Sequence, residues 1–100
     1  MDRSTWKKDE MKVARFFDTV RTPLSGISSR HSGSDTLHKD LYIEIKMRKK
    51  IPFLKTFKET IEQAKEENKI PLVVFREKGS RIPIVMCNLN DLKKIGEYVI

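Results

Sequence analysis

The chain has 100 residues, of which 38% are hydrophobic and 35% charged, so it suits one small folded domain (residues 1–100) rather than a disordered segment. The sequence contains no run of about 18 apolar residues, so we expect no membrane-spanning helix. The polar start MDRSTWKKDE does not have the composition of a secretory signal. The formal net charge of +7 favours a polyanionic partner, and we place nucleic acid ahead of an acidic membrane surface or a merely soluble basic protein.

The first predicted element is a helix over residues 4–19. Its apolar face recurs at helical spacing and contains one acid, Glu10, between hydrophobic positions such as Val13 and Phe17. A carboxylate on a buried face is unfavourable unless a cation, backbone donors or a metal satisfies it. The nearest candidate partner in the sequence is Arg21.

Residues 20–34, VRTPLSGISSRHSGS, predict a loop rich in Ser and Gly with basic residues interspersed. Small residues let a backbone approach a phosphate closely, and Arg21, Arg30 and His31 supply charge. A plain connector is the alternative, although a loop of this length in a small domain is more often functional.

The rest of the chain predicts alternating strands and helices. A short strand at Ser34–Leu37 is followed by a turn at HKD and by the strand Leu41–Met47, in which apolar and polar residues alternate. The later predicted elements are a helix from Pro52 to Glu67 stopped by Asn68, a buried strand PLVVF (71–75), an edge strand Arg81–Cys87 containing Pro83, and a last helix after Asn90. The order α-β-β-α-β-β-α predicts an α/β fold with a small mixed sheet flanked by helices.

The strand Leu41–Met47 carries the residues with the clearest chemical potential. Glu44 and Lys46 lie two positions apart and therefore project to the same side. Pairing across the turn can bring the carboxylate of Asp35 close to that of Glu44. Two adjacent carboxylates repel, and a divalent cation such as Mg²⁺ between them removes the repulsion. The backbone carbonyl of Ile45 could add a ligand.

Each of these residues also has an ordinary interpretation. Glu-x-Lys is usually a solvated strand face, Asp35 could be a turn residue, and the cluster Arg48, Lys49 and Lys50 could be plain surface. Asp40 is a rival ligand that fits the turn better. His38 could reach the site or DNA, although a turn histidine is preferred. One cysteine, Cys87, excludes an internal disulfide, and with two histidines it makes a zinc site improbable.

The order of these residues resembles the PD-(D/E)xK nuclease superfamily, and within it the Holliday-junction-resolvase-like branch of archaea and phages. The resemblance covers roughly residues 6–75. It rests on Glu10 in the first helix, RTPLSG at 21–26, Asp35, and Glu44-Ile45-Lys46 on a strand. The proline expected before the aspartate is replaced by Ser34.

The resemblance implies a role for each matching position. Asp35 and Glu44, with the Ile45 carbonyl, would bind Mg²⁺ (Mn²⁺ able to substitute), Lys46 would be the catalytic lysine, and Glu10 would support the metal or its waters. The remaining implied positions are Ser25 near the scissile DNA, Arg21 and Arg30 on phosphate, and Gln63 facing the site from the second helix. Basic residues His31, Arg48, Lys49 and Lys50 would also meet DNA.

These residues predict a Mg²⁺-dependent endodeoxyribonuclease, most specifically a four-way-junction resolvase acting as a homodimer with no membrane association. The alternatives are a nicking or less specific phage-type endonuclease and a non-catalytic DNA-binding module on the same fold. An unrelated RNA-binding or interaction protein ranks last, because the chain lacks an aromatic RNA-binding signature. The expected compartment is the cytoplasm of a prokaryotic cell or of a phage- or virus-infected host.

Overall fold

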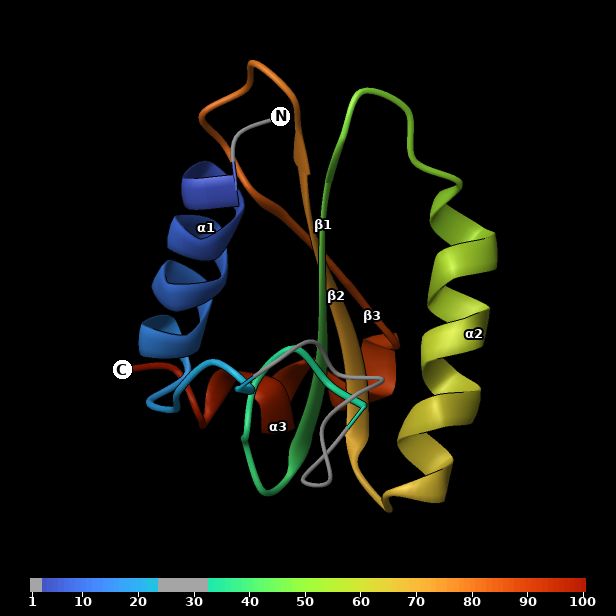
Figure 1. The fold of residues 1–100 in the computed structure, drawn as a ribbon. Coiled ribbons are helices and arrows are strands. Elements are labelled where there is room, and N and C mark those ends of the chain that lie inside the picture. The colour runs from blue at the N-terminus through green and yellow to red at the C-terminus, as the bar shows by residue number, and fades with distance from the viewer. Residues whose placement is uncertain (1–2, 24–32) are drawn as a thin grey trace.

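The computed structural model describes residues 3–23 and 33–100, and within them a three-stranded sheet lies between helices (Figure 1). The helices are α1 (Arg3–Phe16), α2 (Phe53–Glu66) and the short α3 (Leu92–Gly96), which follows a 3₁₀ turn at Leu89–Asp91. The strands are β1 (Leu41–Arg48), β2 (Ile70–Glu77) and β3 (Ile84–Cys87). The predicted α/β class with a small mixed sheet is therefore confirmed. No helix among the described residues has both the length and the apolarity to cross a membrane.

The strands lie in the order β1-β2-β3. β1 and β2 are parallel and joined through α2, as parallel neighbours require a crossover, whereas β2 and β3 are antiparallel and joined by a turn. The continuous apolar run of β2 was predicted to be buried on both faces, and it occupies the centre of the sheet. β3 forms one edge, as Pro83 predicted, but begins later than expected, at Ile84.

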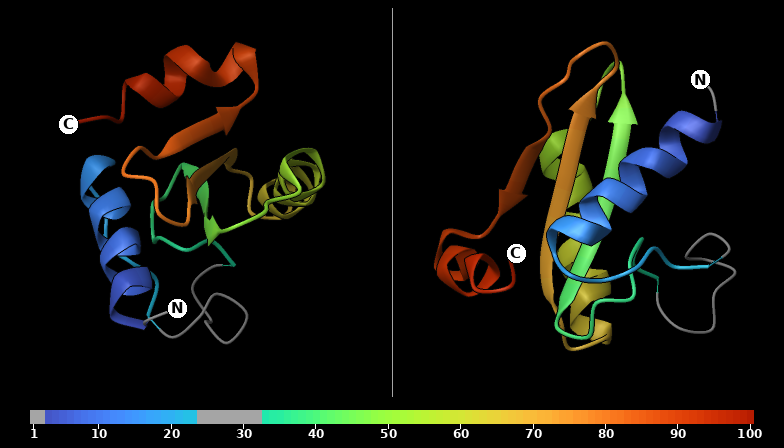
Figure 2. Two further views of the ribbon diagram at one scale, coloured as in Figure 1. Left: turned by 90° about the horizontal axis from the view of Figure 1, so that it is seen from above. Right: turned by 90° about the vertical axis from the view of Figure 1, so that its left-hand side faces the viewer.

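The two faces of the sheet are covered by different helices (Figures 1 and 2). On one face, Ile43, Ile45 and Val74 pack with Phe17, which follows α1, and with Ile95 of α3. On the other, Val73 and Phe75 pack with Phe57 of α2. β1 forms one edge of the sheet, with α1 on one face and α2 on the other. The segment 33–40 runs beside this edge.

The helix boundaries differ slightly from the prediction for identifiable reasons. α1 ends at Phe16 rather than at residue 19, because Asp18 adopts a left-handed conformation with φ 53°. α2 ends beside Asn68, whose φ of 54° confirms the predicted stop. In α3 only Ile95 is buried, while Tyr98 beyond it is half-buried.

The predicted strand at Ser34–Leu37 was wrong in extent. Only Thr36 makes a bridge, antiparallel to Arg21, and the segment forms no continuous ladder with β1. The described order is therefore α-β-α-β-β-α, with one strand before α2 rather than two. The side-chain contacts that replace the ladder also define the candidate site.

Candidate active site at the edge of β1

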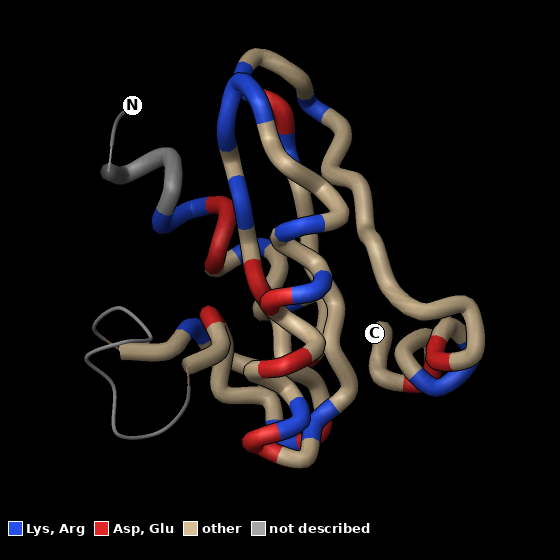
Figure 3. The backbone as a smooth tube through the Cα atoms, turned by 90° about the vertical axis from the view of Figure 1, so that its right-hand side faces the viewer, with Lys and Arg blue, Asp and Glu red and all other residues tan. Residues whose placement is uncertain are grey.

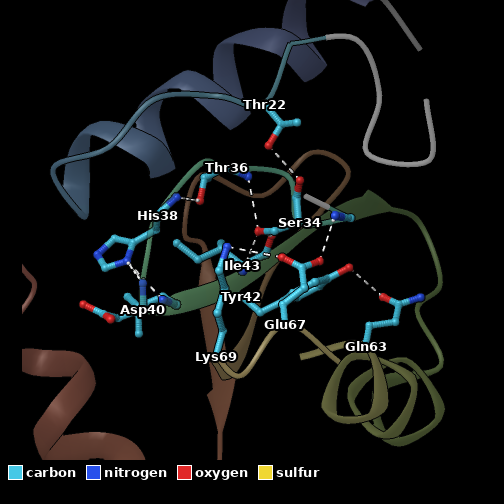
Figure 4. Close-up of polar contacts among 12 residues, drawn as sticks. Thr22, Ser34, Thr36, His38, Asp40, Tyr42, Ile43, Gln63, Glu67 and Lys69 are labelled. Atoms are coloured by element: carbon cyan, nitrogen blue, oxygen red, sulfur yellow. Dashed lines mark hydrogen bonds and ion pairs between the residues drawn. The ribbon is translucent and has the colours of Figure 1, made fainter. Parts of the chain in front are cut away.

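Ser34 attaches the segment before β1 to the strand through its side chain (Figure 4). Its Oγ accepts a hydrogen bond from Ile43 N at 2.9 Å and donates one to Ile43 O at 3.0 Å. The backbone N–H of Asp35 also donates to Ile43 O, at 2.9 Å. Ser34 is fully buried, so these bonds satisfy edge groups of β1 that a regular ladder would otherwise pair.

Asp35 is the next residue, and its carboxylate continues along the same edge. Its Oδ2 accepts a hydrogen bond from Ile45 N at 2.7 Å. Burial, and after it the negative charge of Glu44, raise the pKa of Asp35 to about 8, although the Ile45 N–H opposes the rise. Asp35 and Glu44 are thus close enough to disfavour both being ionised, as the sequence had suggested.

Ile45 presents its carbonyl to the same edge. In an extended strand the N–H and C=O of one residue point to the same side. Since the Ile45 N–H is directed at Asp35, the carbonyl is directed there too. Two carboxylates and one carbonyl are oxygen donors of the kind that Mg²⁺ selects.

Glu44 and Lys46 project from β1 on one side of the strand and contact each other. The Lys46 Nζ lies 3.2 Å from Glu44 Oε1, and both side chains are partly accessible to solvent. Lys46 also lowers the pKa of Asp35, which places its ammonium within electrostatic reach of both carboxylates. The structure therefore brings together Asp35, Glu44, the Ile45 carbonyl and Lys46.

Glu10 approaches this group from α1. It is 3% exposed, and the Nε of Arg21 donates to its Oε1 at 2.6 Å. Burial raises the pKa of Glu10, Arg21 opposes the rise, and the charge of Glu44 adds to it. The pairing with Arg21 that the sequence left open is therefore present. Arg21 positions Glu10 in this structure, which differs from the phosphate contact implied for it.

His38 belongs to the turn before β1. Its Nδ1 accepts hydrogen bonds from the backbone N–H groups of Asp40 and Leu41, each at 3.0 Å, and its ring packs edge-on against Tyr98. Burial lowers the pKa of His38, consistent with a neutral ring. These contacts agree with the turn histidine that the sequence analysis preferred over a residue reaching the site or DNA. Asp40 likewise belongs to the turn, where its Oδ2 accepts the Tyr98 hydroxyl at 3.0 Å.

Two contacts connect α2 and the residue that follows it with β1 and with the segment before β1 (Figure 4). The Tyr42 hydroxyl donates to Gln63 Oε1 at 3.0 Å, so the Gln63 side chain faces β1. Tyr42 lies two positions before Glu44 on the same strand. Glu67 Oε2 accepts the Gly33 N–H at 2.9 Å. A Cβ on Gly33 would lie 2.7 Å from the Tyr42 hydroxyl oxygen, which explains a glycine there.

The predicted DNA-contacting residues divide into two sets. Ser25, Arg30 and His31 lie outside the described residues. Arg48, Lys49 and Lys50 are all exposed where β1 ends. Figure 3 shows basic segments gathered at this end of the sheet, near the turn between β2 and β3. Lys46 therefore lies two positions before the basic end of β1.

The sequence reasoning missed several residues that shape this site. The double hydrogen bond of Ser34 has no distinctive signal, because serine before aspartate is common in turns. Arg76 Nε and Nη2 both donate to Asp9 Oδ2, at 3.1 and 2.7 Å, and these two positions are too distant in sequence to be paired by pattern. Among the described residues, no cluster of three or more Asp, Glu, His or Cys side chains could hold a metal unaided.

We compared the chain with protein-family models, curated proteins and solved structures, and found no match.

Proposed function

We propose that this protein is a Mg²⁺-dependent DNA endonuclease, and most specifically a resolvase of four-way DNA junctions. The observation that carries the proposal is the partly buried Asp35 carboxyl, which accepts the Ile45 N–H at 2.7 Å beside Glu44 and has its pKa raised to about 8. Such crowding is unfavourable for folding, and perturbed acids of this kind concentrate at functional sites. The order of Glu10, Asp35, Glu44 and Lys46 along the chain, similar to that of PD-(D/E)xK nucleases, supports the same reading.

The donor set fits a hard divalent cation. The carboxylates of Asp35 and Glu44 and the carbonyl of Ile45 would hold Mg²⁺, or Mn²⁺ in its place. A bound ion of this kind supplies a water of lowered pKa and screens the charge of a phosphodiester. Because all three oxygen donors would bind the ion from the edge of β1, its side away from the strand would stay open to water and substrate.

The other residues act on the substrate side. Lys46 offers a compact cation beside Glu44, suited to orienting water or stabilising charge on the phosphoryl oxygens. Glu10, which is held by Arg21, would support the metal or its waters from α1. The exposed Arg48, Lys49 and Lys50 suit the DNA backbone. A DNA substrate and a single cysteine suit the cytoplasm of a prokaryotic cell or of a phage- or virus-infected host.

Cleavage assays separate the alternatives. Labelled four-way junction and plain duplex are each incubated with the protein in Mg²⁺, in Mn²⁺ and in EDTA. We expect paired symmetric nicks in the junction with either metal and none in EDTA. Equal cutting of duplex would favour the less specific endonuclease, and binding without cutting in either metal would favour the non-catalytic module. Cutting that persists in EDTA would contradict the metal mechanism.

A resolvase must cut two strands, and we propose that it does so as a homodimer joined through β3. β3 is an edge strand, and Ile82, Ile84, Val85, Leu89 and Leu92 on and around it are 48–83% exposed. An exposed apolar edge is suited to pairing with another chain. Residues 82–92 contain one charged side chain, Asp91, so two chains of net charge +7 can approach here with least repulsion. Because β1 lies at the opposite edge, both candidate sites stay open.

We expect sedimentation to show a species of about twice the chain mass of 11.7 kDa at micromolar concentration. Ile84→Lys should raise the dimer dissociation constant at least about tenfold, since a buried lysine replaces an apolar contact. The matched control is Leu54→Lys on α2, which is 67% exposed and outside the β3 surface. A monomeric wild type, or equal effects of both variants, would contradict this interface.

A further inference from the structure

A second concave feature lies on the α1 side of the sheet, adjoining the candidate active site. It is a pocket of about 310 Å³ lined by residues of α1, β1, β2 and the turn between β2 and β3. Lys46 lines this pocket and also contacts Glu44 at 3.2 Å. Its side chain projects with that of Glu44 to the side of β1 opposite Ile45 and Met47, so the pocket and the proposed site meet at Lys46 on the edge strand.

The pocket has an excess of positive charge. Besides Lys46, whose ammonium contacts Glu44, three of its lining residues are cationic, Lys12, Arg76 and Arg81, and one is acidic, Asp9. Among residues 3–23 and 33–100, neither Lys12 nor Arg81 takes part in an ion pair, and both are exposed. Their charge is thus available to an anionic ligand.

Arg76 and Asp9 give the pocket a fixed wall. Arg76 Nε and Nη2 donate to Asp9 Oδ2 at 3.1 and 2.7 Å, and Nη1 donates to Ser80 O at 2.9 Å. These bonds tie α1 to the turn after β2. Because Arg76 compensates the acid, Asp9 does not cancel the charge of Lys12 and Arg81.

The remaining lining is apolar and includes Val13, Met47 and Val74. A cationic rim over an apolar floor suits a ligand with an anionic group attached to a less polar body. A small inorganic anion would use only the rim. The deoxyribose and phosphate of a nucleic-acid strand would use both the rim and the floor.

From this geometry we infer that the pocket binds the deoxyribose phosphate next to the one cut, with Lys12 and Arg81 as its principal phosphate contacts. The position of the nucleotide relative to the cut rests on the proposed function, whereas binding of the strand does not. A strand crossing the edge of β1 would pass from Glu44 over Lys46 and into the pocket. Neither Lys12 nor Arg81 was singled out from the sequence as a DNA contact.

The test is DNA binding in EDTA, so that no cutting occurs. A fluorescently labelled short duplex is titrated with wild type, with the double variant Lys12→Glu/Arg81→Glu, and with the charge-matched control Lys58→Glu/Lys93→Glu on α2 and α3. We expect the double variant to raise the dissociation constant at least about tenfold beyond the control, and to lower the slope of log affinity against log salt by about 2. Thermal unfolding by circular dichroism verifies that each variant folds.

The outcomes distinguish this inference from the proposed nuclease activity. If the double variant binds no more weakly than the control, the inference is overturned, whether or not wild type cuts junctions. If the double variant shows the specific loss but wild type never cuts with Mg²⁺ or Mn²⁺, strand binding in the pocket stands and the nuclease proposal fails.

Discussion

Asp35→Asn is expected to abolish DNA cleavage and at the same time make the protein more stable at neutral pH. Cleavage should fall at least about a thousandfold, because the variant loses one of two carboxylates proposed to hold the metal. Stability should rise because the amide keeps an oxygen that can accept the Ile45 N–H and, unlike the carboxylate, needs no proton uptake on folding to lie beside Glu44. We expect the free energy of unfolding to increase by about 1–3 kcal/mol at pH 7.5.

The pH dependence of this difference has a definite sign. The pKa of Asp35 is about 8 in the folded protein and near the ordinary 3.8 when unfolded. Between these values the folded state holds a proton that the unfolded state has released, so the contribution of Asp35 to stability falls as pH rises. Urea unfolding should show the Asp35→Asn gain growing from pH 4 to pH 8. Glu59→Gln, at an exposed position of α2, is the control and should change neither activity nor stability. A gain largest at pH 4 would contradict this account.

Binding of Mg²⁺ is expected to release protons and to strengthen as pH rises. At pH 7 the Asp35 carboxyl is mostly protonated, whereas metal binding requires the carboxylate. We expect close to one proton to be released per ion at pH 7, and affinity to rise up to about tenfold per pH unit below pH 8. Calorimetry in two buffers of different ionisation enthalpy measures the released protons.

Asp35→Asn provides the control for this linkage. The variant should bind Mg²⁺ more weakly and release almost no proton, because its amide does not titrate. Wild-type binding that is independent of pH, or accompanied by no proton release, would show that Asp35 is not a ligand.

The sequence predicted most of the regular elements because their patterns are local. Alternation identified β1, the continuous apolar run identified β2, and helical spacing identified α1 and α2. It failed at Ser34–Leu37, where the hydroxyl of Ser34 and the carboxylate of Asp35 take the positions of backbone partners of β1. Nothing in the residue types distinguishes a segment bound by side chains from a short paired strand.

The candidate site was likewise predictable only where it depends on local pattern. Strand parity alone placed Glu44 and Lys46 together. The position of Asp35 depended on how the preceding segment meets β1, and the sequence left that register open. The contact between Arg76 and Asp9 depends on the packing of α1 against the far end of β2, so only the structure could reveal the pocket beside Lys46.

The most direct test of the central claim is the rate at which Glu44→Gln cuts a labelled four-way junction in Mg²⁺, relative to wild type. The variant replaces the second proposed carboxylate with an amide of the same shape, and circular dichroism establishes that it folds. Our account predicts junction cutting by wild type and a loss of at least about a thousandfold in the variant. Wild-type rates in Glu44→Gln would contradict a metal-dependent site at the edge of β1.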